Sequence, residues 1–187
     1  CALTSTGALI CWGLNDLGQL GNGTTTASNV PVPVSGLGSD VVTMDCGRTH
    51  ACALLTDGTL RCWGDNWSGG LGDGTTVNSL VPVPVTGISS ATAVATGSFF
   101  TCALLENHTV KCWGAGSAGQ LGQGSFVGSL TPVEVSGLVQ PVTISNSWYF
   151  TCALQADGMG KCWGDNSSGQ LGDGTLINRS TPVTVLP

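Results

Sequence analysis

The stretch CALLTDGTLRCWG, residues 52–64, places two cysteines ten positions apart around a Thr-Asp-Gly tripeptide. Residues 56–58 suit a three-residue hairpin loop, a type I turn followed by a glycine in the left-handed conformation as a G1 bulge. Counting outward from the pair that closes this loop places Cys52 directly opposite Cys62. The register makes them a non-hydrogen-bonded pair, in which Cα atoms approach to about 4.5 Å, within reach of a disulfide. A disulfide-bridged β-hairpin is therefore predicted here.

The same spacing recurs along the chain and predicts four disulfides: Cys1–Cys11, Cys52–Cys62, Cys102–Cys112 and Cys152–Cys162. In the third copy His108 takes the place of the loop glycine, so it needs a positive φ, for which histidine is one of the more tolerant residues. The alternatives are buried free thiols or a metal site, but zinc sites have closer cysteines or histidine partners. Because disulfides persist in oxidising compartments, we expect an extracellular or cell-surface protein. We also expect no metal and no cofactor.

The amino-acid composition excludes some classes of binding partner. Charged residues make up 9% of the 187 residues, apolar residues 41%, and the net charge is −6 with only five lysines and arginines. A chain so poor in cations offers no patch for nucleic acid or anionic lipid, and no apolar run has transmembrane length. We expect no signal peptide within these residues, and we disfavour a lipid-bearing Cys1 because its place in the repeat assigns it to Cys11. We interpret the chain as a mature or fragmentary piece of a longer one.

The ninth cysteine, Cys46, has no partner in the repeat. It is either a buried free thiol, which we favour because free cysteine is among the most buried residue types, or an intermolecular partner. Five Asn-x-Ser/Thr sequons permit glycosylation, and all but the last lie in expected turns: Asn22, Asn66, Asn107, Asn166 and Asn178.

The Cys-Trp-Gly triplets recur at Trp12, Trp63, Trp113 and Trp163, with spacings of 51, 50 and 50 residues. We expect a single repeat array over 1–187, divided into repeats 1–51, 52–101 and 102–151 and a partial repeat 152–187, about 3.7 repeats in all. No helical period is present, and the second unit predicts four strands at 50–55, 59–64, 81–86 and 91–96. This is typical of an all-β, β-propeller fold with four-stranded blades, in which the Pro82/Pro84 strand is either outermost or irregular.

The segments CWGLNDLGQLGNGT (11–24) and CWGDNSSGQLGDGT (162–175) resemble the signature of the regulator of chromosome condensation repeat family. Its pattern Trp-Gly-x-Asn-x-x-Gly-Gln-Leu-Gly-x-Gly is matched in full in these two copies. Gly70 replaces the glutamine in the second copy and Gly116 the asparagine in the third. The resemblance implies a propeller, usually of seven blades, with the glycines forming tight turns and the leucine and tryptophan packing between sheets.

The resemblance also implies functions that this chain fits unequally. Eukaryotic members act on a small GTPase in the nucleus and bind chromatin. Four oxidised hairpins and an acidic chain fit both of these functions poorly. The chain looks more similar to secreted bacterial or environmental members, in which the propeller is a scaffold. One such type inhibits β-lactamases by docking a propeller face. A guanine-nucleotide exchange factor is therefore the least favoured of the functions considered.

Catalytic and ligand-binding sites are not expected. His50 is explained by its place in the repeat rather than by a dyad with Cys46, and the acidic residues fall at turns rather than facing one cleft. One carboxylate in each glycine loop is too few for calcium, and no lysine or helix completes a phosphate loop. A repeated row of cations, Arg61, Lys111 and Lys161, is either a solvated face or a stripe that binds a partner.

About 3.7 repeats cannot close a seven-bladed ring, so further repeats, copies of the same chain or a smaller ring must cover the open ends. Our first hypothesis is a non-enzymatic, secreted structural protein, such as a self-assembling fibre subunit, because the low charge density favours self-association. The alternative is a secreted binding module or inhibitor that uses one propeller face.

Overall fold

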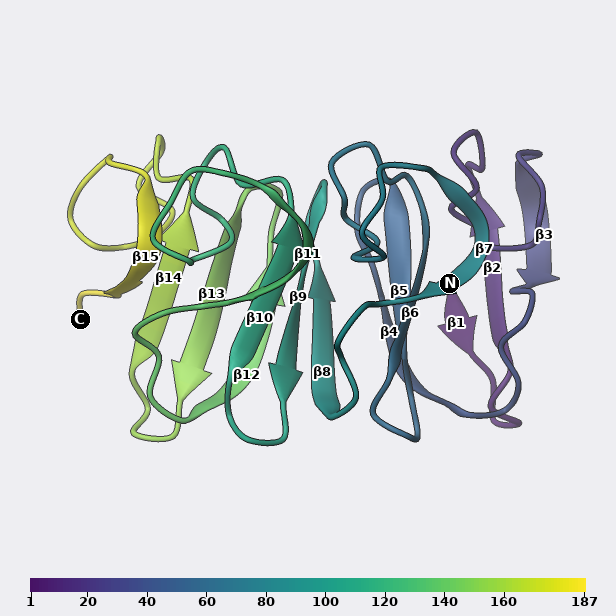
Figure 1. The fold of residues 1–187 in the computed structure, drawn as a ribbon, viewed down its shortest axis with the longest axis horizontal. Coiled ribbons are helices and arrows are strands. Elements are labelled where there is room, and N and C mark those ends of the chain that lie inside the picture. The colour runs from purple at the N-terminus through teal and green to yellow at the C-terminus, as the bar shows by residue number, and fades with distance from the viewer.

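The computed structural model describes all residues 1–187 and contains fifteen β-strands and no helix, and therefore no helix that could cross a membrane (Figure 1). The strands form one three-stranded and three four-stranded antiparallel sheets, the blades of the array. The first blade consists of β1 (Ala2–Leu3), β2 (Leu9–Gly13) and β3 (Ser28–Pro33). The second consists of β4 (Val41–Cys46), β5 (His50–Leu55), β6 (Leu60–Gly64) and β7 (Ser79–Pro84).

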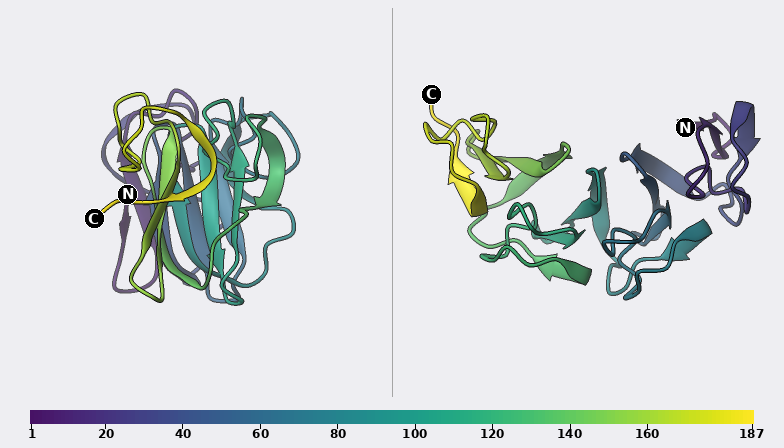
Figure 2. Two further views of the ribbon diagram at one scale, coloured as in Figure 1. Left: turned by 90° about the vertical axis from the view of Figure 1, so that its left-hand side faces the viewer. Right: turned by 90° about the horizontal axis from the view of Figure 1, so that it is seen from above.

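The third and fourth blades repeat this plan. The third consists of β8 (Ala91–Thr96), β9 (Phe100–Leu105), β10 (Val110–Gly114) and β11 (Ser129–Glu134). The fourth consists of β12 (Pro141–Asn146), β13 (Phe150–Gln155), β14 (Gly160–Gly164) and β15 (Arg179–Thr184). Within each blade every strand pairs with the next in the sequence, so the blades are meanders, and they stand side by side along an arc (Figure 2). The expected all-β propeller architecture is confirmed.

The strands β4, β8 and β12 lie on the concave side of this arc, and β7, β11 and β15 lie on its outside (Figure 2). The proline-containing strand is therefore outermost, the first of the two predicted alternatives, where its missing N–H groups leave no gap in a ladder. It begins at Ser79, two residues before the predicted start at 81. The reason is a bulge between Cys62 and Gly64 that brings Gly64 opposite Ser79.

The hairpin register in the second blade is the predicted one. The loop closes through a bond from Leu55 N–H to Thr59 O of 2.9 Å, and Gly58 has a φ of +76°. Cys52 lies opposite Cys62 with their Cα atoms 4.1 Å apart, and the other three hairpins show the same disulfide. His108 takes the expected positive φ, at +60°.

The core lies between neighbouring blades rather than inside one sheet. The Cys52–Cys62 disulfide, for example, is buried in one cluster with Leu71 of its own blade and Trp113 of the next. The tryptophans at 63, 113 and 163 are fully buried, and each donates its indole N–H to a loop carbonyl of the preceding blade. The acceptors are Gln19 O at 3.0 Å, Gly70 O at 2.9 Å and Gln120 O at 3.0 Å. We call this contact the tryptophan joint.

Glycine is required on the other side of each joint. Gly72 has a φ of +69°, and a Cβ atom placed there would lie 2.6 Å from the indole nitrogen of Trp113. Gly21 and Gly122 make equivalent approaches to Trp63 and Trp163. The glycine-rich motif thus serves blade packing, because a side chain there would push the next tryptophan out of its site.

Candidate functional site

The two ends of the array differ in what they expose. The turns between β4 and β5, β8 and β9, and β12 and β13 lie at the same end as the long glycine loops, which we call the loop end (Figure 1). The disulfide hairpins turn at the opposite end, the hairpin end. The loop end gathers the aromatic and cationic side chains that form the candidate site.

Three turns at the inner rim of the loop end place one arginine between aromatic rings. The guanidinium carbon of Arg48 lies 5.9 Å from the ring centre of Phe99 and 5.8 Å from that of Trp148. Tyr149 extends the row, with its ring centre 6.5 Å from that of Phe99. Cation–π contacts contribute about 0.5–1 kcal/mol each at exposed sites, so the rings hold the guanidinium in place without a carboxylate. We call Arg48, Phe99, Trp148 and Tyr149 the aromatic clamp.

Hydrogen bonds between blades hold the clamp turns together. Ser98 N–H donates to Trp148 O at 3.2 Å, and Arg48 N–H donates to Gly97 O at 3.4 Å. These bonds link the three turns to one another, so the clamp sits on a connected frame.

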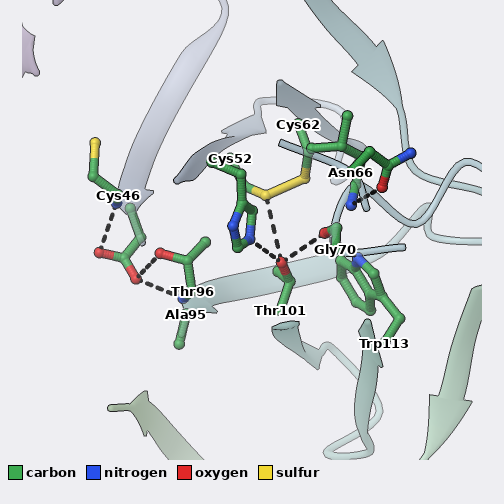
Figure 3. Close-up of a disulfide and its surroundings, with 12 residues drawn as sticks. Cys46, Cys52, Cys62, Asn66, Gly70, Ala95, Thr96, Thr101 and Trp113 are labelled. Atoms are coloured by element: carbon green, nitrogen blue, oxygen red, sulfur yellow. Dashed lines mark hydrogen bonds between the residues drawn. A yellow bond between two sulfur atoms is a disulfide. The ribbon is translucent and has the colours of Figure 1, made fainter. Parts of the chain in front are cut away.

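The inner strands below the turns are bridged as well. The Asp45 carboxylate accepts from the N–H of Thr96 at 2.7 Å and from its hydroxyl at 2.9 Å (Figure 3). From the other side, the Asn146 amide donates to Ala95 O at 2.8 Å. Strand β8 thus has its unpaired inner edge capped by side chains of both neighbouring blades.

A pocket of about 400 Å³ opens beside the clamp; its lining includes Arg48, Trp148, Ser98, Asn146 and Cys46. Two buried polar atoms in this lining have no hydrogen-bond partner, the Ser98 hydroxyl and the Asn146 side-chain oxygen. Because unpartnered buried polar groups are costly, such atoms mark a place where a ligand or water completes the bonding. The pocket is therefore polar at its base and aromatic at its rim.

His50 has the structural position predicted for it. Its ring is buried and its Nε2 lies 2.8 Å from the hydroxyl of Thr101, which in turn donates to Gly70 O at 2.9 Å. With that hydroxyl proton directed at Gly70, Nε2 carries the imidazole proton. Burial lowers the pKa of His50 to about 4, so the ring is neutral at pH 7. It supports the same loop carbonyl that receives Trp113 (Figure 3).

Cys46 is unpaired, but our preference for a buried thiol is wrong because the residue is exposed on the concave side of the array. It ends strand β4, and the chain continues into the Arg48 turn. Desolvation by the neighbouring strands raises the pKa of the thiol although part of the residue meets solvent. This environment makes Cys46 accessible and slow to react at neutral pH.

Two of the sequons expected to be accessible are not. Asn66 is 1% exposed and Asn166 is fully buried, and each amide donates into its own glycine loop. A glycan has no room there in the folded chain. Asn107 is exposed at a hairpin tip, and Asn22 and Asn178 are half-buried.

The cation row occupies one register position in three blades. Arg61, Lys111 and Lys161 lie opposite equivalent alanines, are half-buried and form no ion pair. The Asp173 carboxylate, in the glycine loop of the fourth blade, is paired within its own loop. Hydrogen bonds from Thr175 and also from Arg179 and Asn166 lower the pKa of this carboxyl to about 2. No three His, Cys, Asp or Glu side chains gather in a group that could hold a metal ion.

Comparison with known proteins agrees with the repeat pattern. The Regulator of chromosome condensation (RCC1) repeat model matches residues 6–54, 57–104 and 108–154. A Danio rerio protein RCC2 homolog is 41% identical over 80 residues, covering 42% of this chain and 16% of the relative. The Arabidopsis thaliana ultraviolet-B receptor UVR8 is 39% identical over 72 residues, covering 38% of this chain and 16% of that protein.

Solved structures show the same fold. Human WBSCR16 superposes with a TM-score of 0.91 at 26% identity, over 99% of this chain and 50% of that one. Yeast RCC1 (Prp20), solved with Kap60, gives 0.83 at 18% identity, over 97% and 45%. The chain thus spans about half the length of these structures and a smaller share of the curated relatives. The repeat matches, which cover most of the 187 residues, show that the chain belongs to the Regulator of chromosome condensation (RCC1) repeat family.

Proposed function

We propose that this chain is a non-enzymatic protein-binding module of an oxidising, extracellular compartment, and that its partner docks on the loop end. The observation that carries the proposal is the aromatic clamp, in which an arginine with no carboxylate partner stands beside a tryptophan that is 67% exposed. Arginine, tryptophan and tyrosine are the residue types enriched where binding energy concentrates in protein interfaces.

The rest of the loop end supports a broad contact. Its long loops expose apolar side chains in each of the last three blades: Trp67, Val77, Phe126, Val127, Leu176 and Ile177. Single exposed apolar residues are ordinary, but a recurrence at one end of successive blades is typical of an interaction surface. The fold also suits such a role, because yeast RCC1 has been solved with Kap60 bound and its binding to Gsp1p and histones has been described.

The compartment is proposed from the disulfides. All four pairs are closed, and eight of the nine cysteines are in disulfides. Cytosolic thiol buffers keep most such cysteines reduced, so a secreted or surface location accounts for them best. Nucleotide exchange on a small GTPase remains the alternative to test, by measuring release of a labelled guanine nucleotide.

Site-specific photocrosslinking tests the binding role. A benzophenone amino acid in place of Trp148 is expected to crosslink to another polypeptide in the medium of the producing cells. The matched control carries it in place of Asp157 at a hairpin tip. A purified crosslinked partner must then bind the unmodified chain and lose affinity with Trp148→Ala. Equal crosslinking at both positions, or none at either, contradicts the proposal.

A second candidate, self-association, is favoured by the end blades. Trp12 is 46% exposed, although the equivalent tryptophans of the other blades are fully buried. Gly172, at the other end, has no indole against it within residues 1–187. We infer that each end accepts one more blade of the same type, from further repeats or a second copy. Sedimentation of the chain and of Trp12→Ala tests this, and assembly that is unaffected by the substitution rules the joint out.

A further inference from the structure

We propose that the guanidinium of Arg48 binds the carboxylate of an aspartate or glutamate side chain on the docked partner. The inference rests on the proposed binding role and names the chemistry that the aromatic clamp recognises. The first step is that the guanidinium is unsatisfied: it makes no ion pair and its side chain makes no hydrogen bond in the chain. Arg179, by contrast, is paired with Asp173 at 2.7 Å.

The second step is the geometry of the clamp. Phe99 and Trp148 hold the guanidinium by contacts to their ring faces, at 5.9 and 5.8 Å. Ring faces attract the positive charge but do not replace hydrogen-bond acceptors, so the N–H donors of Arg48 stay available. A carboxylate matches this fork in shape and charge, whereas an amide or hydroxyl supplies weaker acceptors.

The third step is the polar base of the adjoining pocket. Ser98 is 1% exposed, its hydroxyl has no partner, and it lines the same pocket of about 400 Å³ as Arg48. A hydroxyl can donate to a second carboxylate oxygen while the guanidinium donates to the first. The pocket therefore offers both a cation and a neutral donor, and Trp148 adds an apolar wall.

Charge decides which kind of partner segment fits. The chain carries a net charge of −6, and two carboxylates belong to the surroundings of the Arg48 turn. Asp45 precedes Arg48 by three residues, and the Asp65 carboxylate lies 3.2 Å from the hydroxyl of Thr49. A polyanionic partner would be repelled by this field. One acidic side chain flanked by apolar residues gains the Arg48 contact and covers Trp148 without that cost. The occupant is thus an isolated acidic residue in an otherwise uncharged segment.

Titration of the full chain with blocked tripeptides tests the inference. The probes are N-acetyl-Gly-Glu-Gly-amide, the same peptide with glutamine, and Gly-Gln-Gly with a free carboxyl terminus. The readouts are the NMR signals of the Arg48 side-chain N–H and the Trp148 indole N–H. We expect the glutamate peptide to shift both signals saturably, and Arg48→Gln to weaken its binding about tenfold, the loss typical of a charge-assisted hydrogen bond.

Arg61→Gln is the matched control, because Arg61 is an unpaired, half-buried cation on the strand β6 of the same blade. It should leave peptide affinity unchanged, and Ser98→Ala should weaken it less than Arg48→Gln. Equal shifts with glutamate and glutamine peptides overturn the inference, as does an equal loss in Arg61→Gln. Binding of the free-terminus peptide alone overturns the side-chain source. If crosslinking at position 148 persists while none of the peptides binds, the binding role stands and only the proposed contact between Arg48 and a carboxylate is wrong.

Discussion

Asn66 is the residue whose exchange tests the loop architecture most directly. Its amide donates to Thr75 O and Val77 O, both at 3.1 Å, and its side-chain oxygen accepts from Leu71 N–H at 3.0 Å. Asn66→Asp keeps the size and the acceptor but removes the donor. Leaving a buried acceptor unsatisfied costs about 1–3 kcal/mol, so with two carbonyls affected we expect the free energy of unfolding to fall by about 2–6 kcal/mol.

Urea unfolding followed by tryptophan fluorescence measures this loss, and its pH dependence separates the causes. The new carboxyl would face backbone oxygens and the carboxylate of Asp73, which raise its folded-state pKa above the unfolded value of about 3.9. The charge penalty is therefore absent below that pH and grows as the pH rises.

Asn107→Asp is the control, because Asn107 accepts only from Thr109 at an exposed hairpin tip, where the second blade already has Asp57. It should change stability by less than about 0.5 kcal/mol. A small effect at both positions, or a penalty that does not vary with pH, refutes the role given to Asn66.

Three further predictions concern other parts of the chain. Alkylation without a reductant should modify Cys46 alone, faster as the pH rises because its thiol pKa is raised; mass spectrometry finding label on any other cysteine contradicts the disulfide assignment. His50, with its pKa lowered to about 4, is neutral in the fold, so its contribution to stability is present above about pH 6.5 and lost as the pH falls toward 4, by up to about 3 kcal/mol. His50→Phe, which copies Phe100, should flatten that acid limb in thermal melts, and an unchanged limb would show that other groups cause it. Gly116→Asn should destabilise the chain in urea although it restores the family motif, because a Cβ there meets Val127 O; a gain in stability would show that the loop rearranges freely.

The repeat and hairpin were predictable because short-range rules set them. A three-residue loop with a left-handed third residue fixes the cysteine register, and Gly58 and His108 both adopt that conformation. The outer strand was placed two residues late because the bulge after Cys62 leaves no mark in the hydrophobic pattern. Interactions between successive residues were thus accessible from the sequence, whereas a slip between strands was not.

The burial of Asn66 was missed because Asn-x-Ser suggests an exposed turn. A signal was present, however. Asn66 and Asn166 each have an aspartate seven residues on and a threonine nine residues on, and both residues contact the asparagine amide. In the third blade Gly116 replaces the asparagine, and Gln123 donates to Val127 O instead. The paired change indicates a contact that a single copy does not reveal.

The aromatic clamp could not be read from one repeat at all. Arg48, Phe99 and Trp148 come from three turns about fifty residues apart, at positions that differ from copy to copy. Their meeting depends on how sharply the blades fan around the arc. Cys46 was misjudged for a related reason, since the sequence does not tell which end of an inner strand opens to the concave side.

The tryptophan joint gives every internal boundary of this molecule the same two halves, an indole on one blade and a glycine-flanked carbonyl on its neighbour. A duplicated or deleted repeat adds or removes one such indole together with one such carbonyl. The number of repeats can therefore change in evolution without leaving an internal boundary that lacks either partner. The tips of the turns between β4 and β5, β8 and β9, and β12 and β13 are not part of the tryptophan joint. Side chains at the turn tips can therefore change while the tryptophan joints between blades stay the same.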